Sequence, residues 1–237
     1  MKFLLLLLGS VKFGKVLLSA GSMVLSVGVY AWMYGWPFAV GFVALILVHE
    51  LGHYVAARRR GLAVGLPTFV PFFGAWVELK DLPHDAETEA YVGLAGPLVG
   101  TLGALACFYA ARGLDSRLLL ALAYSGFLIN LLNLIPLKPF DGGRITVAIS
   151  PRIWLLGVPM LIALFIVRPS PMLVAMSILA LPYALKAWRG PATDAERAYE
   201  AVPAETRLGY GIAYLGLAAF LAIMCNELRL ELPASPA

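Results

Sequence analysis

Long apolar runs alternate with short polar or basic segments along almost the whole chain. A helix needs about 20 mainly apolar residues to cross the hydrocarbon core of a bilayer. The pattern therefore predicts an all-α polytopic membrane protein with six to seven transmembrane helices. We expect the spans at residues 16–34, 38–57, 91–111, 118–134, 153–167 and 172–188, with a last apolar run at 208–225 as the seventh.

Composition narrows the class of protein further. Of the 237 residues, 61% are hydrophobic and only 14% are charged, which excludes an ordinary soluble domain. The basic residues stand at the ends of apolar runs and form no single patch, so we expect a lipid bilayer as a partner and no nucleic acid. Cys107 and Cys225 lie inside apolar runs and are interpreted as small core residues, not as a disulfide or as metal ligands.

The pattern divides the chain into three parts. Residues 1–15 carry three lysines around a short apolar run and are predicted to form a basic segment at the membrane interface. Residues 16–188 form the transmembrane core. Residues 189–237 combine a polar linker, the last transmembrane helix and a short tail. Within the linker, Thr193 and Glu196 have the spacing of a capping box for a short helix.

Basic residues also predict the orientation in the membrane. Arg58, Arg59 and Arg60 end the second span, and lysine and arginine accumulate on the cytoplasmic side of membranes. We expect a prokaryotic plasma membrane, since no organelle-targeting segment is evident. With the expected spans, only four of the 18 basic residues lie on the outer side, namely Arg112, Arg117, Arg168 and Arg229.

Residues 61–89 form the longest stretch that is not expected to span the membrane. Its part from Thr68 to Lys80 is rich in aromatic and β-branched residues and is interrupted by a proline and a glycine. This part is too short to span and predicts a β-hairpin or a re-entrant loop beside the site described next. The acidic residues that follow, up to Glu89, are expected to be solvated, and so is His84.

The second span carries a cluster of ionisable residues, His49-Glu50-Leu51-Gly52-His53. His49 and His53 are four residues apart, so a helix places them one turn apart on one face. Two imidazoles so placed can hold one Zn²⁺, with Glu50 beside them to take a proton from a water molecule. The alternative is a pair of hydrogen-bonded, metal-free histidines inside a helix bundle. Because such side chains are costly in hydrocarbon, their grouping favours a functional site.

The end of the fourth span supplies a third candidate ligand. The stretch from Asn130 to Arg144 holds two prolines and two glycines within eight residues, which forbids a continuous helix. In such a break Asp141 can aim its carboxylate into the bundle, although Pro-x-Asp-Gly is also an ordinary surface turn. The expected topology puts Asp141 on the same side as His53, which is five residues from Arg58. We therefore predict a site inside the membrane but near its cytoplasmic face.

The third span begins with small residues at Gly93, Gly96 and Gly100. Small residues along a membrane helix let a neighbouring helix approach closely. We predict a packing face there.

The two motifs together resemble the site-2 protease family of intramembrane zinc metalloproteases, peptidase family M50. The resemblance rests on H-E-L-G-H in an early span and N-x-x-P-x-x-P-x-D-G-G in a later one, and it covers the second span to Arg144. Phe140 stands where the family usually has Leu or Met. No candidate for a PDZ or CBS domain is evident, so the chain resembles a minimal, core-only member.

Carried over position by position, the resemblance implies that one Zn²⁺ per chain is held by His49, His53 and Asp141. It implies that Glu50 is the catalytic base. Asn133 matches the motif asparagine, which in the family would contact the substrate or the developing oxyanion. Its alternative role is a hydrogen bond within the bundle to the asparagine one turn before it.

The function implied is that of a zinc-dependent intramembrane endopeptidase, which cleaves a transmembrane segment of a membrane-protein substrate near the cytoplasmic face. Since a transmembrane helix hides its carbonyls in its own hydrogen bonds, the substrate must unwind, and residues 68–80 are placed to hold the unwound piece as an added strand. One alternative is a metal-ion transporter, but transporters commonly show repeated halves, which this sequence lacks. The other is a catalytically inactive scaffold of the same fold, against which the intact Glu50 argues.

Overall fold

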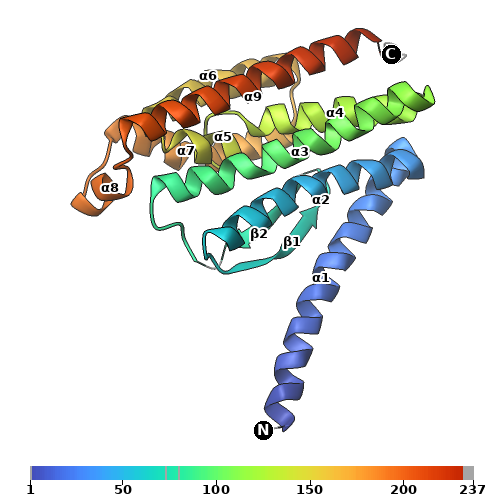
Figure 1. The fold of residues 1–237 in the computed structure, drawn as a ribbon, viewed down its shortest axis with the longest axis horizontal. Coiled ribbons are helices and arrows are strands. Elements are labelled where there is room, and N and C mark those ends of the chain that lie inside the picture. Colours follow the sequence, from blue (N-terminus) through green and yellow to red (C-terminus); the bar gives the residue numbers. More distant parts are fainter. Residues whose placement is uncertain (1, 73, 80, 232–237) are drawn as a thin grey trace.

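The structure, a computed structural model, describes residues 2–72, 74–79 and 81–231. Helices make up most of it, and two strands follow each other between the second and third helices (Figure 1). In chain order the elements are α1 (Lys2–Tyr34), α2 (Trp36–Arg59), β1 (Val64–Val70), β2 (Gly74–Leu79), α3 (Ala86–Leu114), α4 (Arg117–Asn133), α5 (Asp141–Thr146), the 3₁₀ helix η1 (Pro151–Ile153), α6 (Trp154–Val167), α7 (Pro171–Arg189), α8 (Asp194–Tyr199) and α9 (Ala204–Glu231).

Among the described residues, five helices are long and apolar enough to cross a membrane: Gly14–Tyr34 of α1, and the whole of α2, α3, α7 and α9. The other two expected spans are shorter helices, α4 with 17 residues and α6 with 14. At 1.5 Å per residue, α4 measures about 25 Å and α6 about 21 Å, less than the hydrocarbon thickness of ~30 Å. The predicted class, an all-α polytopic membrane protein, is confirmed.

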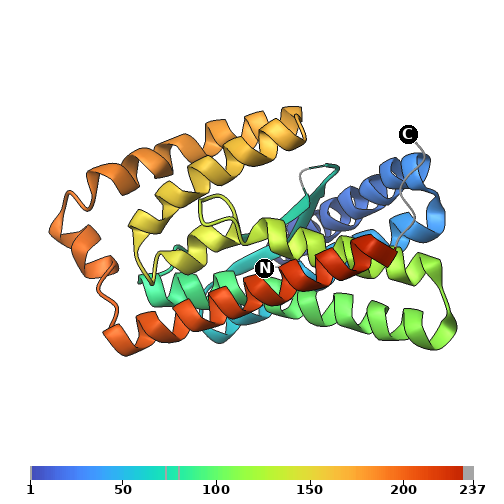
Figure 2. The same cartoon turned by 90° about the horizontal axis from the view of Figure 1, so that it is seen from above.

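The helices form two groups that meet at the loop between α4 and α5. In the first group α2, α3 and α4 lie side by side, and α9 packs along α4 (Figures 1 and 2). In the second group α6 packs against α7, on the other side of the molecule (Figure 2). Leu134 belongs to the apolar core of the first group, whereas Ile135 and Leu137 belong to that of the second. The loop is therefore anchored in both cores.

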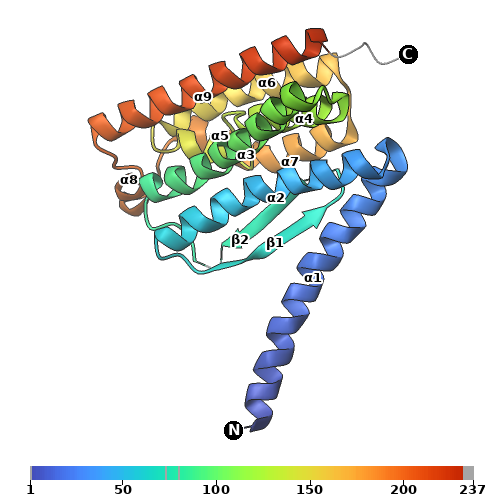
Figure 3. The same cartoon turned by 45° about the vertical axis from the view of Figure 1, so that its right-hand side comes forward.

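The first helix, α1, leaves the bundle towards its N-terminal end (Figures 1 and 3). It runs without a break past residue 15, so the expected interfacial segment 1–15 continues directly into the first span. Gly35, with a φ of 84°, makes the tight turn into α2 that only glycine adopts easily. The position of residues 1–15 at the membrane interface stays a prediction.

The strands β1 and β2 form the predicted hairpin, with antiparallel pairing of Phe69 to Ala75 and of Val70 to Gly74. The hairpin lies beside α1 and α2 (Figure 3). Helix α1 covers the outer edge of β1, because Ser19 Oγ donates to Pro67 O at 2.5 Å and Phe69 N donates to Ser22 Oγ at 3.1 Å. Phe73 and Lys80, which the prediction included, lie outside the described residues.

The acidic segment before α3 differs from the expectation. The Asp85 side chain caps the helix by accepting a hydrogen bond of 2.6 Å from Thr88 N. Helix α3 therefore begins at Ala86, ahead of the expected start at residue 91, and Glu89 is buried in the bundle with 7% exposure. The prediction of a solvated segment is wrong for Glu89, whereas His84 is exposed as expected.

The C-terminal part follows the predicted pattern. The capping box is confirmed at α8, where Thr193 Oγ1 accepts from Glu196 N and the Glu196 carboxylate accepts from Thr193 N. Helix α9 contains the expected run at 208–225 and is longer at both ends. The tail from residue 232 lies outside the described residues.

Replacing Leu221 by Ala should destabilise the protein, because Leu221 is fully buried in the core that α9 shares with α3 and α4. Loss of a buried leucine side chain costs about 2–5 kcal/mol of unfolding free energy, through lost burial and the cavity left behind. Leu215 on the same helix is 66% exposed, and Leu215→Ala should change stability by no more than about 0.5 kcal/mol. Reversible unfolding of both variants in mixed micelles measures the difference, and equal losses would contradict this packing of α9.

Candidate metal centre

Three ionisable residues of α2 are buried inside the bundle. His49, Glu50 and His53 are 3%, 5% and 5% exposed. The helix runs uninterrupted from Trp36 to Arg59, so the spacing of four residues places the two imidazoles on neighbouring turns. Their ring centroids lie 4.9 Å apart.

Asp141 reaches the histidines through the break between α4 and α5. Helix α4 ends at Asn133, and the chain turns through residues 134–140 before Asp141 begins α5. The turn is held by Phe140 N, which donates to Leu137 O at 3.0 Å, and by Trp154 Nε1, which donates to Gly143 O at 2.9 Å. Asp141 is 7% exposed, so it does not belong to an ordinary surface turn.

The three side chains meet at one point. His49 Nε2 lies 3.1 Å from Asp141 Oδ2, His53 Nε2 lies 3.2 Å from the same oxygen, and the two Nε2 atoms are 3.1 Å apart. The residues come from two elements separated by 88 or more positions in the chain, so this triangle is a product of the fold.

Hydrogen bonds on the far side of each ring determine which nitrogen carries the proton. His53 Nδ1 lies 2.8 Å from Val92 O, a carbonyl that can only accept, so Nδ1 is the donor. His49 Nδ1 lies 2.7 Å from Asn130 Oδ1, while Asn130 Nδ2 donates to Gly126 O at 2.7 Å. Because that second bond orients the amide, we assign His49 Nδ1 as a donor as well. Both Nε2 atoms therefore present lone pairs to the centre of the group.

A bound cation would satisfy all three atoms of this group. Two lone pairs and a carboxylate oxygen repel one another at 3.1–3.2 Å unless a positive charge lies between them. Zinc ligands at 2.0–2.2 Å in a tetrahedral array stand about 3.3–3.6 Å apart, close to this spacing. Imidazole nitrogen and carboxylate oxygen are ordinary zinc ligands, and three of them leave one position open, as in catalytic sites. The group His49, His53 and Asp141 is thus positioned for a metal and fits Zn²⁺.

Helix α3 is the surface on which these residues pack. A Cβ at Gly96 would collide with the imidazole of His53, and one at Gly100 would collide with the side-chain amide of Asn130. The predicted packing face of small residues is therefore present, and it lies directly under the metal group. Any larger residue at Gly96 would displace a candidate ligand.

The two asparagines at the end of α4 differ in their surroundings. Asn130 is 2% exposed and orients His49, a contact across 81 positions that the sequence alone does not indicate. Asn133 is partly exposed and, within the described part of the chain, makes no side-chain hydrogen bond, so the alternative role of a bond to Asn130 is not seen. The available signal for Asn130 was chemical: a metal-bound histidine nearly always donates its other N–H to a fixed acceptor.

Arg144 and Glu50 are two other charged residues close to the candidate ligands. Arg144 Nη1 lies 3.7 Å from Asp141 Oδ1, on the carboxylate oxygen that does not face the histidines. The Glu50 carboxylate makes no side-chain hydrogen bond to the described residues.

Cys107 and Cys225 are free thiols in partly buried and buried positions, as expected of core residues.

Comparison with known proteins agrees with this centre. The family model described as "Peptidase family M50" matches residues 37–115, which include the two histidines and Glu50. The chain is 33% identical over 120 residues to "Zinc metalloprotease MJ0392" from Methanocaldococcus jannaschii, covering 48% of this chain and 34% of the relative. It is 34% identical over 122 residues to "Putative zinc metalloprotease Rip3" from Mycobacterium tuberculosis, covering 48% and 31%.

A plant relative is similar over a shorter stretch. "Probable zinc metalloprotease EGY1, chloroplastic" from Arabidopsis thaliana is 34% identical over 77 residues, covering 30% of this chain and 14% of the relative. In all three cases the match spans about a third or less of the relative's length. Residues 37–115 thus match the model of peptidase family M50, and the three relatives that the chain resembles are each named as a zinc metalloprotease. The individual roles of His49, Glu50, His53, Asp141 and Asn133 stay predictions.

Replacing Asn130 by Ala should weaken zinc binding about 10- to 100-fold, because it removes the acceptor that orients the His49 ring. Competition with a chelator of known affinity, on purified protein in detergent, measures the change. Asn133→Ala, one turn away on the same helix, is the matched control and should leave zinc affinity unchanged. Equal losses in the two variants would contradict the proton positions assigned above.

Proposed function

We propose that the protein is a zinc-dependent intramembrane endopeptidase, which cleaves a transmembrane segment of a membrane-protein substrate near the cytoplasmic face. The single observation that carries the proposal is the buried triangle of His49 Nε2, His53 Nε2 and Asp141 Oδ2, one residue away from Glu50 on α2. Metalloproteases with two histidines four residues apart use such a neighbouring glutamate as the general base. A site that only stores a metal has no need of that glutamate.

In this proposal His49, His53 and Asp141 hold one Zn²⁺, which when bound supplies a Lewis acid that makes water more acidic and polarises a peptide carbonyl. Glu50 moves the protons: it accepts one from the attacking water and gives one to the leaving amine as the C–N bond breaks. At 5% exposure the Glu50 carboxylate meets little competing bulk water. Asn133, partly exposed at the end of α4, is proposed to contact the substrate.

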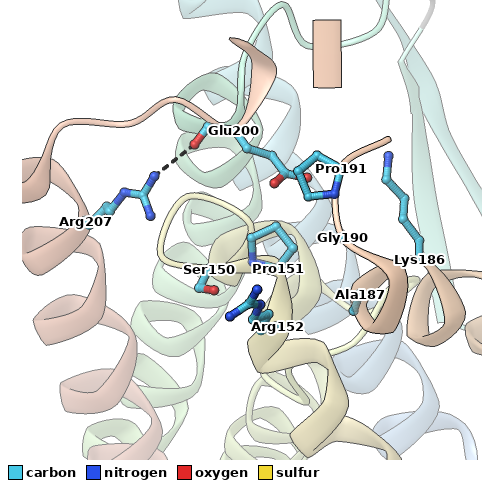
Figure 4. Close-up of a pocket in the computed structure, with 9 residues that line it drawn as sticks. All are labelled: Ser150, Pro151, Arg152, Lys186, Ala187, Gly190, Pro191, Glu200 and Arg207. Atoms are coloured by element: carbon cyan, nitrogen blue, oxygen red, sulfur yellow. Dashed lines mark hydrogen bonds between the residues drawn. The ribbon is translucent and has the colours of Figure 1, made fainter. Parts of the chain in front are cut away.

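The proposed side of cleavage depends on where the basic residues gather. At the end of α2, Arg60 Nη2 lies 3.4 Å from Glu87 Oε1 of α3. Tyr210 Oη of α9 donates a hydrogen bond to the backbone carbonyl of the same Glu87. The ends of α2 and the starts of α3 and α9 therefore lie together. A pocket of about 210 Å³ brings together further basic residues from η1, the end of α7 and the start of α9 (Figure 4). It is lined by Ser150, Pro151, Arg152, Lys186, Ala187, Gly190, Pro191, Glu200 and Arg207.

Within a bacterial or archaeal plasma membrane, an end so rich in Lys and Arg would face the cytoplasm. His53 precedes Arg58 by five residues on the same helix, a rise of about 7.5 Å. The proposed site thus lies below the membrane surface, within reach of water from the cytoplasm. We propose this orientation for the protein in a prokaryotic plasma membrane.

We propose that the hairpin binds the unwound segment of the substrate. Helix α1 covers the outer edge of β1 through Ser19 and Ser22, and among the described residues no strand pairs with the outer edge of β2. Main-chain hydrogen bonds along an open strand edge can bind an extended peptide of many sequences. Strand β2 is therefore the one proposed to accept it.

Replacing Glu50 by Gln should lower cleavage of single-span reporter peptides by at least ~100-fold, the usual contribution of a general base. Zinc content should stay equal to that of the wild type, because Glu50 is not among the three ligands proposed. Glu227→Gln, an exposed position on α9, is the control and should cleave normally. Undiminished cleavage by the Glu50→Gln variant would refute the mechanism, and zinc bound without any cleavage by the wild type would favour the inactive scaffold.

Replacing Val77 by Pro removes a backbone donor from β2 and should slow cleavage about tenfold or more while one zinc stays bound. Val77→Ala keeps the donor and serves as the control, with cleavage close to that of the wild type. Peptide cleavage and bound zinc are measured on the same preparations. If the proline variant cleaves normally, β2 is not where the substrate binds.

A further inference from the structure

We propose that Glu89 and Lys138 form a positioning pair that holds the loop before Asp141 and thereby sets the place of that ligand relative to His53. The inference rests on the metal centre of the proposed function. Neither residue touches the candidate ligands, so both act through the backbone.

Lys138 ties the loop to α3. It lies in the turn between α4 and α5, three residues before Asp141, and its Nζ stands 2.5 Å from Glu89 Oε1. The Lys138 side chain is only 19% exposed, and its Nζ lies 5.1 Å above the ring of Trp154. Since Trp154 also donates to Gly143 O, the lysine and the indole hold the loop on both sides of Asp141.

Glu89 is fixed by contacts to both of its oxygens. Lys138 binds Oε1, and Tyr199 Oη of α8 donates to Oε2 at 2.6 Å. Burial and the neighbouring Glu89 carboxylate raise the pKa of Tyr199 well above its ordinary value, so its phenol remains a donor at neutral pH. A carboxylate with 7% exposure is stable only with such partners, and they restrict it to one position.

The same stretch of α3 also holds His53. Val92, one turn after Glu89, accepts the hydrogen bond from His53 Nδ1 at 2.8 Å. A Cβ at the next residue, Gly93, would meet Arg144 Cβ at 2.8 Å, so α5 packs directly on this turn. Contacts with α3 thus position two candidate ligands from distant parts of the chain, His53 and Asp141. Loosening the Glu89–Lys138 contact frees Asp141 while His53 stays in place.

The chain contains a second lysine–glutamate pair that serves as the matched control. Lys186 Nζ lies 2.8 Å from Glu196 Oε1, but the two side chains are 46% and 33% exposed and join α7 to the start of α8. Neither residue contacts the loop before Asp141. Exposed pairs of this kind contribute little to structure.

The experiment measures zinc affinity by chelator competition in Lys138→Met, Glu89→Gln, the double variant, Lys138→Arg and Lys186→Met. Each of the first two should bind zinc about 10- to 100-fold more weakly, as is usual when a residue supporting a ligand is lost. The double variant should lose no more than about the larger single loss, because both changes remove the same contact. Lys138→Arg should restore affinity to within a few-fold of wild type, and Lys186→Met should leave it unchanged.

Two further measurements distinguish a change in the metal site from a loss of folded protein. Circular dichroism gives the folded fraction of each variant, and the visible absorption of bound Co²⁺ reports the coordination geometry. Weakened binding with an altered Co²⁺ spectrum in folded protein supports the positioning role. Unchanged zinc affinity in folded Lys138→Met and Glu89→Gln would overturn it, as would a loss of stability with no change in affinity or spectrum.

The zinc-affinity series and the cleavage assay test the two proposals separately. A wild-type protein that binds one zinc but cleaves no peptide would contradict the protease, while the affinity series would still decide the role of the pair. A wild-type protein that binds no zinc would contradict both.

Discussion

Two imidazole nitrogens and a carboxylate oxygen meet within 3.2 Å of one another inside this membrane protein. Val92 O and Asn130 Oδ1 accept hydrogen bonds from Nδ1 of His53 and His49 on the far side of each ring, so in the neutral histidines the near side carries only lone pairs. Such an arrangement is unfavourable by itself, because desolvated acceptors repel one another. A bound cation converts the repulsion into attraction, so metal binding and the native packing of this region stabilise each other.

Helix α3 is the element that makes the arrangement reproducible. Its glycine face lets α2 and α4 approach closely enough for His53 and Asn130 to pack on its backbone. Backbone carbonyls and glycine positions leave little freedom to side chains, so the precision of the centre comes from main-chain geometry. This explains how a centre built from α2 and α5 can be held by residues that are neither ligands nor catalytic groups.

The sequence predicted those features that depend on local spacing. The spacing of four positions from His49 to His53 sufficed to place them together on a helix, and the prolines and glycines before Arg144 sufficed to predict a break. The contact of Asn130 with His49 and the burial of Glu89 were missed because each depends on a partner far along the chain. Glu89 was expected in water, since an acidic residue near the end of a polar segment is usually solvated. Only the fold shows that Asp85, not residue 91, marks the start of α3.

The serines of α1 that cover the edge of β1 also limit how copies of the protein can pair with one another in one membrane. A two-stranded sheet with both edges open can pair with its like on either side and extend into a continuous ribbon. Here Ser19 and Ser22 occupy the main-chain groups of one edge, so the hairpin can add a strand on one side only. Pairing of two copies through their β2 edges therefore ends at a dimer, because the β1 edge of each copy is covered.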